Sequence, residues 1–158
     1  MISKDFYEVL IKSGVSFFTG VPDSLLKSVL AYITDNTQEA NNIVAANEGS
    51  AIGIGIGYHL ATNKIPLIYM QNSGLGNSIN PLLSLADKLV YSIPMIMLIG
   101  WRGEPGHKDE PQHVKQGVVT LDILDTMKIK YIVIDEKSSL HDISEIINFA
   151  KEKLVPVA

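Results

Sequence analysis

The chain has 158 residues, a length typical of one globular domain. Its 13 Lys and Arg residues against 17 Asp and Glu leave a net charge of -4, whereas nucleic-acid binders usually carry a basic stripe, so we exclude nucleic acid as a partner. The chain has no cysteine, which excludes disulfides, thiolate metal sites and a cysteine nucleophile.

Apolar runs alternate with stretches of helical periodicity along the chain, a pattern typical of a parallel sheet covered by helices. The predicted elements, in chain order, are a helix at 4–13, a strand at 15–19, a helix from about 25 to 33, a strand at 42–46, a helix at 48–62, a strand at 66–71, a helix at 76–90, a strand at 94–99, a loop at 100–116, a short helix near 120–127, a strand at 130–134, a helix at 139–153 and the opening of a further strand at 154–158. We therefore predict the α/β class, with an open, mostly parallel six-stranded sheet, helices on both faces, and one domain over 1–158.

The longest uncharged stretches, 49–63 and 65–86, are interrupted by Asn, Gln, Ser, Pro and Gly, which a membrane-spanning helix of about 20 mainly apolar residues would not tolerate together. The first residues carry an acid and no apolar signal core. We therefore expect a soluble, cytoplasmic protein without a membrane partner. Because only 19% of the residues are charged, against roughly 25% in an average soluble domain, we expect part of the surface to meet another domain or chain.

Ligands of open α/β sheets bind at the carboxyl ends of the strands, which directs attention to the loops 20–24, 47–50, 71–77 and 100–116. Glu48 stands out because it is one of only two charged residues between Ala40 and Ala86. Burial after an apolar strand would disfavour its ionised form unless a partner compensates. The residues leave two interpretations open, a functional carboxylate and a first-turn Glu that complements the helix dipole.

Gly49, Gly53 and Gly57 recur every four residues and lie on one face of the predicted helix. Such a stripe costs about 1 kcal/mol per glycine relative to alanine, so we expect another helix or subunit to approach this face closely. The alternative, a dinucleotide site of an NAD-type dehydrogenase, is disfavoured because residues 53–57 read G-x-G-x-G and lie inside the helix.

Two further loops carry polar groups. Residues 71–77 follow a strand and precede a helix, which suits their backbone N–H groups and amides to binding a polar ligand, the alternative being a glycine turn with an Asn or Ser cap. The loop 100–116 contains the only Trp and two of the four His. Loops of this length are usually functional or disordered, and we favour function over a solvated charged loop.

Three motifs together resemble the pyrimidine-binding domain of thiamine diphosphate-dependent decarboxylases. They are Gly20-Val21-Pro22-Asp23, Asn47-Glu48-Gly49 and Asn72-Ser73-Gly74-Leu75-Gly76-Asn77. The resemblance covers nearly the whole chain. The long loop is the more specific motif, with its Gly100–Gly106 segment and Asp109-Glu110-Pro111-Gln112-His113, and it is similar to the phosphonopyruvate decarboxylases, whose near relative is the alpha subunit of sulfopyruvate decarboxylase.

The resemblance implies thiamine diphosphate as cofactor and a hydrogen bond from Glu48 to a ring nitrogen of its aminopyrimidine. The other cofactor-binding residues that it implies are Asn72, Ser73, Gly74, Leu75, Gly76 and Asn77. Asp23 and His113 match positions where related decarboxylases keep polar groups beside the reacting carbon, suited to proton transfer. Together with Glu48, they are the expected catalytic residues.

The implied reaction converts a 2-oxo acid, 3-phosphonopyruvate, to phosphonoacetaldehyde and carbon dioxide. Arg102, Lys108 and Lys115 are candidates for neutralising the phosphonate, on their chemistry and their place in the loop. One alternative is the alpha subunit of sulfopyruvate decarboxylase. Another is a decarboxylase-like binding module without catalysis.

The chain departs from the family pattern in lacking the G-D-G sequence with which a second domain holds Mg²⁺ and the diphosphate. We therefore assign no metal ligand to this chain. We expect the second half of the site to come from a diphosphate-binding subunit or from sequence beyond Ala158, in a homo- or hetero-oligomer. On this expectation the chain alone is inactive.

Overall fold

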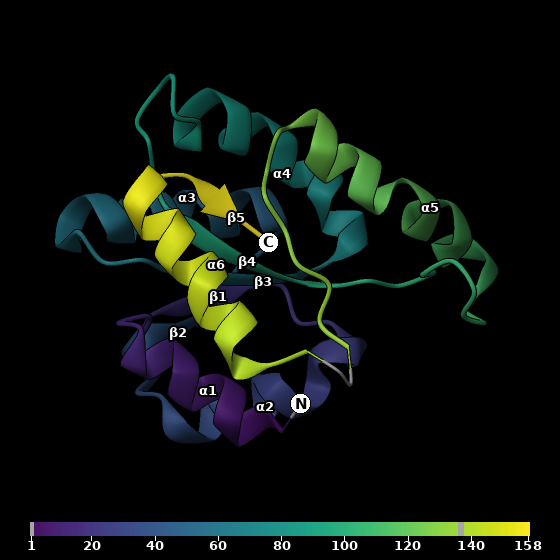
Figure 1. Cartoon of the computed structure of the whole chain (residues 1–158), viewed down its shortest axis with the longest axis horizontal. Coiled ribbons are helices and arrows are strands. Elements are labelled where there is room, and N and C mark those ends of the chain that lie inside the picture. The colour runs from purple at the N-terminus through teal and green to yellow at the C-terminus, as the bar shows by residue number, and fades with distance from the viewer. Residues whose placement is uncertain (1, 136–137) are drawn as a thin grey trace.

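The computed structural model describes residues 2–135 and 138–158 and shows a parallel sheet between two layers of helices (Figure 1). The sheet order is β2-β1-β3-β4-β5. Its strands are β1 (Phe18–Gly20), β2 (Asn42–Val44), β3 (Leu67–Gln71), β4 (Met95–Gly100) and β5 (Pro156–Val157). The predicted α/β class, the parallel sheet and the helices on both faces are confirmed.

The helices bury their apolar faces on opposite sides of the sheet. They are α1 (Ser3–Lys12), α2 (Lys27–Asn36), α3 (Glu48–Thr62), α4 (Leu75–Pro81), α5 (Pro111–Thr126) and α6 (Leu140–Lys153). Residues of α1, α2 and α6 pack with Leu67 and Tyr69, whereas α3, α4 and α5 pack with Ile68 and Met70. Successive side chains of a strand point to opposite faces, so the continuous apolar run of β3 is buried on both sides.

The prediction of six strands is wrong for the described residues, which form five. Residues 130–134 make a single parallel bridge, between Lys130 and Val157, instead of a strand. The partner strand, β5, has only two residues, and Pro156 has no N–H to donate to a ladder. The segment is therefore held beside the sheet without extending it.

Two predicted boundaries are also wrong. Helix α5 begins at Pro111, so the second half of the predicted loop 100–116 is helical, and the helix near 120–127 is only its end. Proline suits a first helical position because its missing N–H needs no partner there. Helix α4 ends at Pro81, which has no N–H to donate to the helical ladder. It continues as a π-helical segment, Leu82–Ala86, so the helical stretch stops before the predicted end at residue 90.

The predicted contact on the glycine face of α3 is only partly present within this chain. A Cβ at Gly49 would lie 2.8 Å from the carbonyl oxygen of Asn77, so α4 approaches closely there. At Gly53 and Gly57 a Cβ would meet nothing within 4 Å beyond the helix's own backbone in the described part of the chain. A contact of these two glycines with another subunit stays a prediction.

We expect Gly53→Ala to raise the free energy of unfolding of the chain by about 0.5–1 kcal/mol, because alanine is the better helix residue and the space is open. Gly14→Ala is the matched control: its surroundings are equally open, but its φ of +77° strains alanine, so we expect a loss of about 1 kcal/mol. Chemical denaturation measures both. A destabilised Gly53→Ala chain would mean that the glycine serves the fold of the isolated chain.

No helix in residues 2–135 and 138–158 is long and apolar enough to cross a membrane.

Candidate functional site

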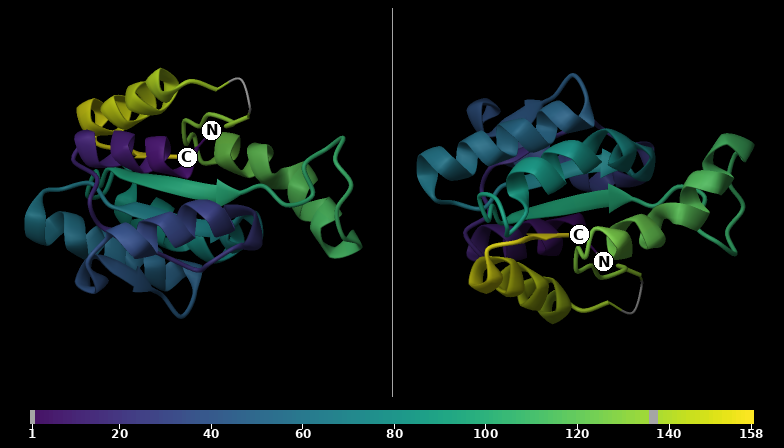
Figure 2. Two further views of the ribbon diagram at one scale, coloured as in Figure 1. Left: turned by 90° about the horizontal axis from the view of Figure 1, so that it is seen from below. Right: turned by 90° about the horizontal axis from the view of Figure 1, so that it is seen from above.

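The loops that follow β1, β3 and β4 begin side by side at one edge of the sheet. Gly20 is in register with Tyr69, and Gln71 is in register with Gly100. Because all strands are parallel, the loops after these residues share the carboxyl edge. The loop after β4 and the first half of α5 project beyond that edge (Figure 2).

Glu48 is the first residue of α3, which starts at this edge. The Asn47 side chain caps the helix by accepting a hydrogen bond from the Ser50 N–H at 2.9 Å. Glu48 is half-buried, and its Oε2 accepts a hydrogen bond from Asn77 Nδ2 at 2.9 Å. Its Oε1 makes no hydrogen bond with any residue that the structure describes. The carboxylate thus has one oxygen fixed by the protein and one oxygen available.

Gly74 provides the space in which the Glu48 side chain lies. A Cβ at Gly74 would lie 2.6 Å from Glu48 Cδ and 2.7 Å from Oε1, closer than real contacts allow. No larger residue fits at position 74 unless Glu48 moves. Glu48, Gly74 and Asn77 were all predicted as cofactor-binding residues, and the structure brings the three together.

The rest of the 72–77 loop has other surroundings. Asn72 is buried, and its Nδ2 donates to the Arg102 carbonyl and to Thr120 Oγ1, both at 2.8 Å. Its polar atoms therefore join the loop after β3 to the loop after β4 and to α5. Ser73 and Gly76 are exposed, and Leu75 is part of the core.

Asp23 is buried at the start of the 3-10 helix Ser24–Leu26, where its Oδ2 accepts a hydrogen bond from the Leu25 N–H at 3.0 Å. A Cβ at Gly100 would collide with Asp23 Oδ2 and lie 3.1 Å from Cγ. The end of β4 therefore needs glycine to admit this carboxyl group. The close approach places Asp23 next to the start of the long loop.

Arg102, Asp109 and His113 form a compact cluster with side chains that are 14–18% exposed. Asp109 Oδ1 lies 2.6 Å from Arg102 Nη2 and 2.9 Å from His113 Nδ1. Asp109 Oδ2 accepts from the Gly103 N–H at 2.8 Å, and Arg102 Nη1 donates to Ser24 Oγ at 3.0 Å. The cluster thus ties the long loop to α5 and to the residue that follows Asp23.

Hydrogen bonds hold the pKa of the Asp109 carboxyl well below its ordinary value. The largest contribution comes from His113, followed by the backbone N–H groups of Glu110 and Gly103 and by Arg102, and together they outweigh the opposing effect of burial. Asp109 is ionised at neutral pH. It was not among the candidates from sequence, although its spacing of four residues from His113 across a helix start is a signal that would have found it.

The three predicted cationic residues differ in their surroundings. The Arg102 guanidinium already contacts Asp109, His113 and Ser24. Lys108 and Lys115 are exposed, and neither forms an ion pair with a described residue. The structure therefore leaves Lys108 and Lys115 as the cations available to an anionic ligand.

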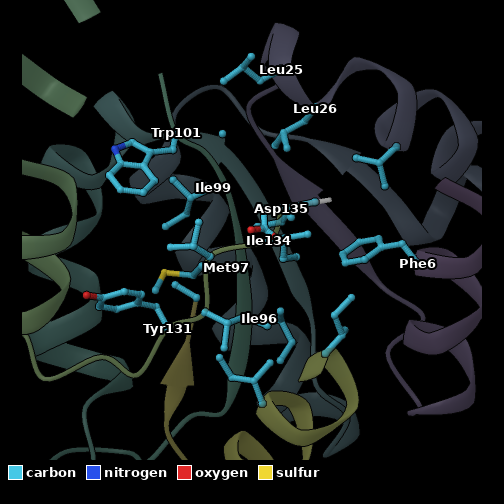
Figure 3. Close-up of a pocket in the computed structure, with 18 of the residues that line it drawn as sticks. Phe6, Leu25, Leu26, Ile96, Met97, Ile99, Trp101, Tyr131, Ile134 and Asp135 are labelled. Carbon is cyan, nitrogen blue, oxygen red and sulfur yellow. The ribbon is translucent and has the colours of Figure 1, made fainter. Parts of the chain in front are cut away.

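An apolar pocket of about 560 Å³ is lined by residues of α1, β4, α5 and α6 and by Trp101 of the long loop. Trp101 and Tyr131 lie at one side of it and Phe6 at the other (Figure 3). Its lining contains neither Glu48 nor the cluster of Arg102, Asp109 and His113.

The chain is similar in sequence to known proteins. Residues 2–129 match the N-terminal TPP binding domain of thiamine pyrophosphate enzymes. The alpha subunit of sulfopyruvate decarboxylase from Methanococcus maripaludis is 40% identical over 129 residues, which are 82% of this chain and 74% of that protein. Phosphonopyruvate decarboxylase from Streptomyces viridochromogenes is 36% identical over 81% of this chain but only 32% of its own length, so the chain spans about a third of that relative.

Solved structures share the fold. Benzoylformate decarboxylase from Polynucleobacter necessarius superposes with a TM-score of 0.70 at 18% identity, over 99% of this chain and 28% of that one. A thiamine diphosphate-dependent 4-hydroxybenzoylformate decarboxylase from Rhodococcus jostii gives 0.66 at 23% identity, over 99% and 29%. Since the family match covers most of the chain and relatives exceed 30% identity over four fifths of it, the chain belongs to the thiamine pyrophosphate enzymes and carries their N-terminal TPP binding domain.

Proposed function

We propose that this chain supplies the pyrimidine-binding half of a thiamine diphosphate-dependent decarboxylase. Its substrate would be a three-carbon 2-oxo acid with a phosphonate or sulfonate group on C3. The observation that carries the proposal is the Glu48 carboxylate, which is half-buried, bonded through one oxygen to Asn77, and placed against a glycine that leaves it room.

The residues around Glu48 fit the aminopyrimidine of the cofactor. Glu48 Oε1 is the available acceptor, and a carboxyl group there would share a proton with a ring nitrogen. Residues 73–77 would border the ring, whereas Asn72 would act through the loop that it fixes. When bound, the cofactor supplies the electron sink that decarboxylation needs. Mg²⁺ and the diphosphate would be held by the partner domain or subunit.

Asp23 and His113 are the proposed proton-transfer residues for aldehyde release. Both belong to one connected group, because Ser24 follows Asp23 and accepts a hydrogen bond from Arg102, which also contacts His113. An imidazole, which has one nitrogen that can donate a proton and one that can accept it, suits this step. The buried Asp23 carboxyl, connected to His113 through Ser24 and Arg102, offers a second place for the proton.

Lys108 and Lys115 are the proposed partners of the anionic group on C3. A phosphonate carries a charge between -1 and -2 near neutral pH, by analogy with phosphate esters, and a sulfonate carries -1. Two available cations therefore suit phosphonopyruvate, which we place first. Sulfopyruvate is the second candidate, because the alpha subunits of two sulfopyruvate decarboxylases match this chain at 40% and 36% identity. Two phosphonopyruvate decarboxylases match at the similar values of 36% and 37%.

The test is an assay of the chain assembled with a diphosphate-binding domain or subunit, thiamine diphosphate and Mg²⁺. Aldehyde is measured from phosphonopyruvate, sulfopyruvate and pyruvate. We expect kcat/KM for one of the two acidic substrates to exceed that for pyruvate by at least about 10²-fold, because a site with unpaired cations rejects a substrate that lacks their partner. The chain alone should form no aldehyde.

Preference for sulfopyruvate would keep the mechanism and change the substrate. A folded, cofactor-loaded assembly that forms no aldehyde from any of the three would overturn the proposal and favour a binding module.

A further inference from the structure

We propose that Asp109 is a positioning residue for His113: it accepts a hydrogen bond from the protonated Nδ1 and thereby leaves Nε2 of the neutral imidazole as the atom that exchanges a proton with the substrate. This inference rests on the proposed function. It concerns a residue outside the three motifs that carry the cofactor-binding resemblance.

Backbone hydrogen bonds hold the Asp109 carboxylate in place independently of His113. Its Oδ1 accepts from the Glu110 N–H at 2.8 Å, and its Oδ2 accepts from the Gly103 N–H at 2.8 Å. His113 lies in the first turn of α5, one turn after Asp109, so its ring lies over the carboxylate with Nδ1 at 2.9 Å from Oδ1. A carboxylate held by two backbone donors offers the imidazole a single, defined partner.

Arg102 offers Nδ1 a competing hydrogen bond, and the two partners require opposite tautomers. Arg102 Nε lies 3.2 Å from Nδ1 and always carries its proton, so bonding to it would require a lone pair on Nδ1. That lone pair would then face the anionic Oδ1 at 2.9 Å, an acceptor against an acceptor. The protonated Nδ1 avoids this repulsion.

Arg102 has a shorter hydrogen bond to Asp109 than to His113. Its Nη2 donates to Asp109 Oδ1 at 2.6 Å, well within the range of charge-assisted hydrogen bonds. When Nδ1 keeps its proton, the guanidinium loses the bond from its Nε but keeps the shorter bonds to Asp109 and Ser24. Among the described residues, Arg102 and Asp109 are the charged groups with a hydrogen bond to His113, and their charges offset each other.

The other ring nitrogen is not used by the protein. His113 Nε2 makes no hydrogen bond with residues 2–135 or 138–158. With Nδ1 protonated, neutral His113 carries its lone pair on Nε2 and can act as a base there, and the imidazolium can return the proton from the same atom. The same division of labour, in which a carboxylate fixes the tautomer of a catalytic imidazole, is well established in other enzymes.

The first test reads the tautomer directly and does not depend on activity. Long-range ¹H–¹⁵N correlation spectra of the 158-residue chain, with ¹⁵N-labelled histidine, report which nitrogen of His113 carries the proton in the neutral ring. We expect Nδ1. A proton on Nε2 overturns the inference, whether or not the assembled protein proves to be a decarboxylase.

The second test uses Asp109→Asn in the assembled enzyme. We expect kcat to fall by about 10²-fold with KM within about threefold, because the base is misoriented and binding is kept. The His113 signals of this variant should move toward the other tautomer, since the asparagine NH₂ group can donate to Nδ1. A merely structural role would not produce that change.

Glu104→Gln is the matched control, because Glu104 lies in the same loop and its Oε2 is 3.9 Å from Nε2 of the exposed His107. We expect its kcat to equal that of the unmodified enzyme. A kcat for Asp109→Asn within twofold of the control overturns the inference. If Asp109→Asn does not fold, as judged by its circular dichroism, the tautomer of His113 in the unmodified chain decides.

Discussion

Glu48→Gln is expected to lower the rate of decarboxylation by the assembled enzyme by about 10²- to 10⁴-fold while the chain keeps its fold. Glutamine has nearly the same shape, so it fits against Gly74, and its carbonyl oxygen can still accept the hydrogen bond from Asn77. The substitution removes the charge of the side chain and its ability to hold a proton, and it replaces one acceptor oxygen with an NH₂ donor. The loss therefore measures these chemical properties of the carboxyl group and not a change in packing.

Aldehyde formation in the coupled assay gives the rate, and calorimetric titration of the assembled enzyme with thiamine diphosphate gives the affinity. Glu145→Gln is the control, because Glu145 is an exposed glutamate of α6 that pairs with His141 at 3.5 Å and is not among the groups proposed for the site. We expect no effect from it. A Glu48→Gln enzyme with more than a tenth of the original rate would leave Glu48 only the role of complementing the helix dipole.

The sequence located Glu48 because a carboxylate between an apolar strand and a glycine-rich helix is conspicuous. Its hydrogen-bond partner lies 29 residues away and its steric neighbour, Gly74, 26 residues away. Both came from the recognised motif, since spacing alone does not say which loops meet. The parallel register places them together, and that register is a property of the whole sheet.

Other features depend on tertiary contacts that local patterns do not contain. Asn72 belongs to the motif, yet its amide is used to join Arg102 and Thr120, which are 30 and 48 residues away. Residues 130–134 have the apolar character of a strand but find a partner strand of only two residues. The start of α5 is mostly polar, and its Val114 is half exposed. The sequence there has no apolar periodicity that would have predicted a helix.

The long loop is held in place from the α5 side, which gives Gly117→Ala a large expected effect. A Cβ at Gly117 would collide with the carbonyl carbon and oxygen of Gly103 and lie 2.8 Å from its Cα. Gly117 also accepts a hydrogen bond at its carbonyl from Trp101 Nε1 at 2.8 Å. The helix and the loop therefore touch backbone to backbone, and only glycine allows that distance.

Two effects of Gly117→Ala oppose each other, and their sizes decide the sign. Alanine favours the helix by about 1 kcal/mol over glycine. The clash is with backbone that cannot give way, because Gly103 has a φ of +68° and its N–H is bound by Asp109. Overpacking of this kind costs about 1–3 kcal/mol, so we expect a net loss in the free energy of unfolding.

The loss should extend to activity, because α5 carries His113 and the loop carries Arg102 and Asp109. We expect kcat of the assembled enzyme to fall at least about tenfold, since moving the loop and α5 apart to relieve the clash misplaces a proton-transfer group. Gly53→Ala is the control for stability, as the same substitution inside a helix with open space beside it. Equal stability of Gly117→Ala and the unmodified chain would show that the loop can move away from α5. That result would contradict a rigid attachment of His113 to the carboxyl edge.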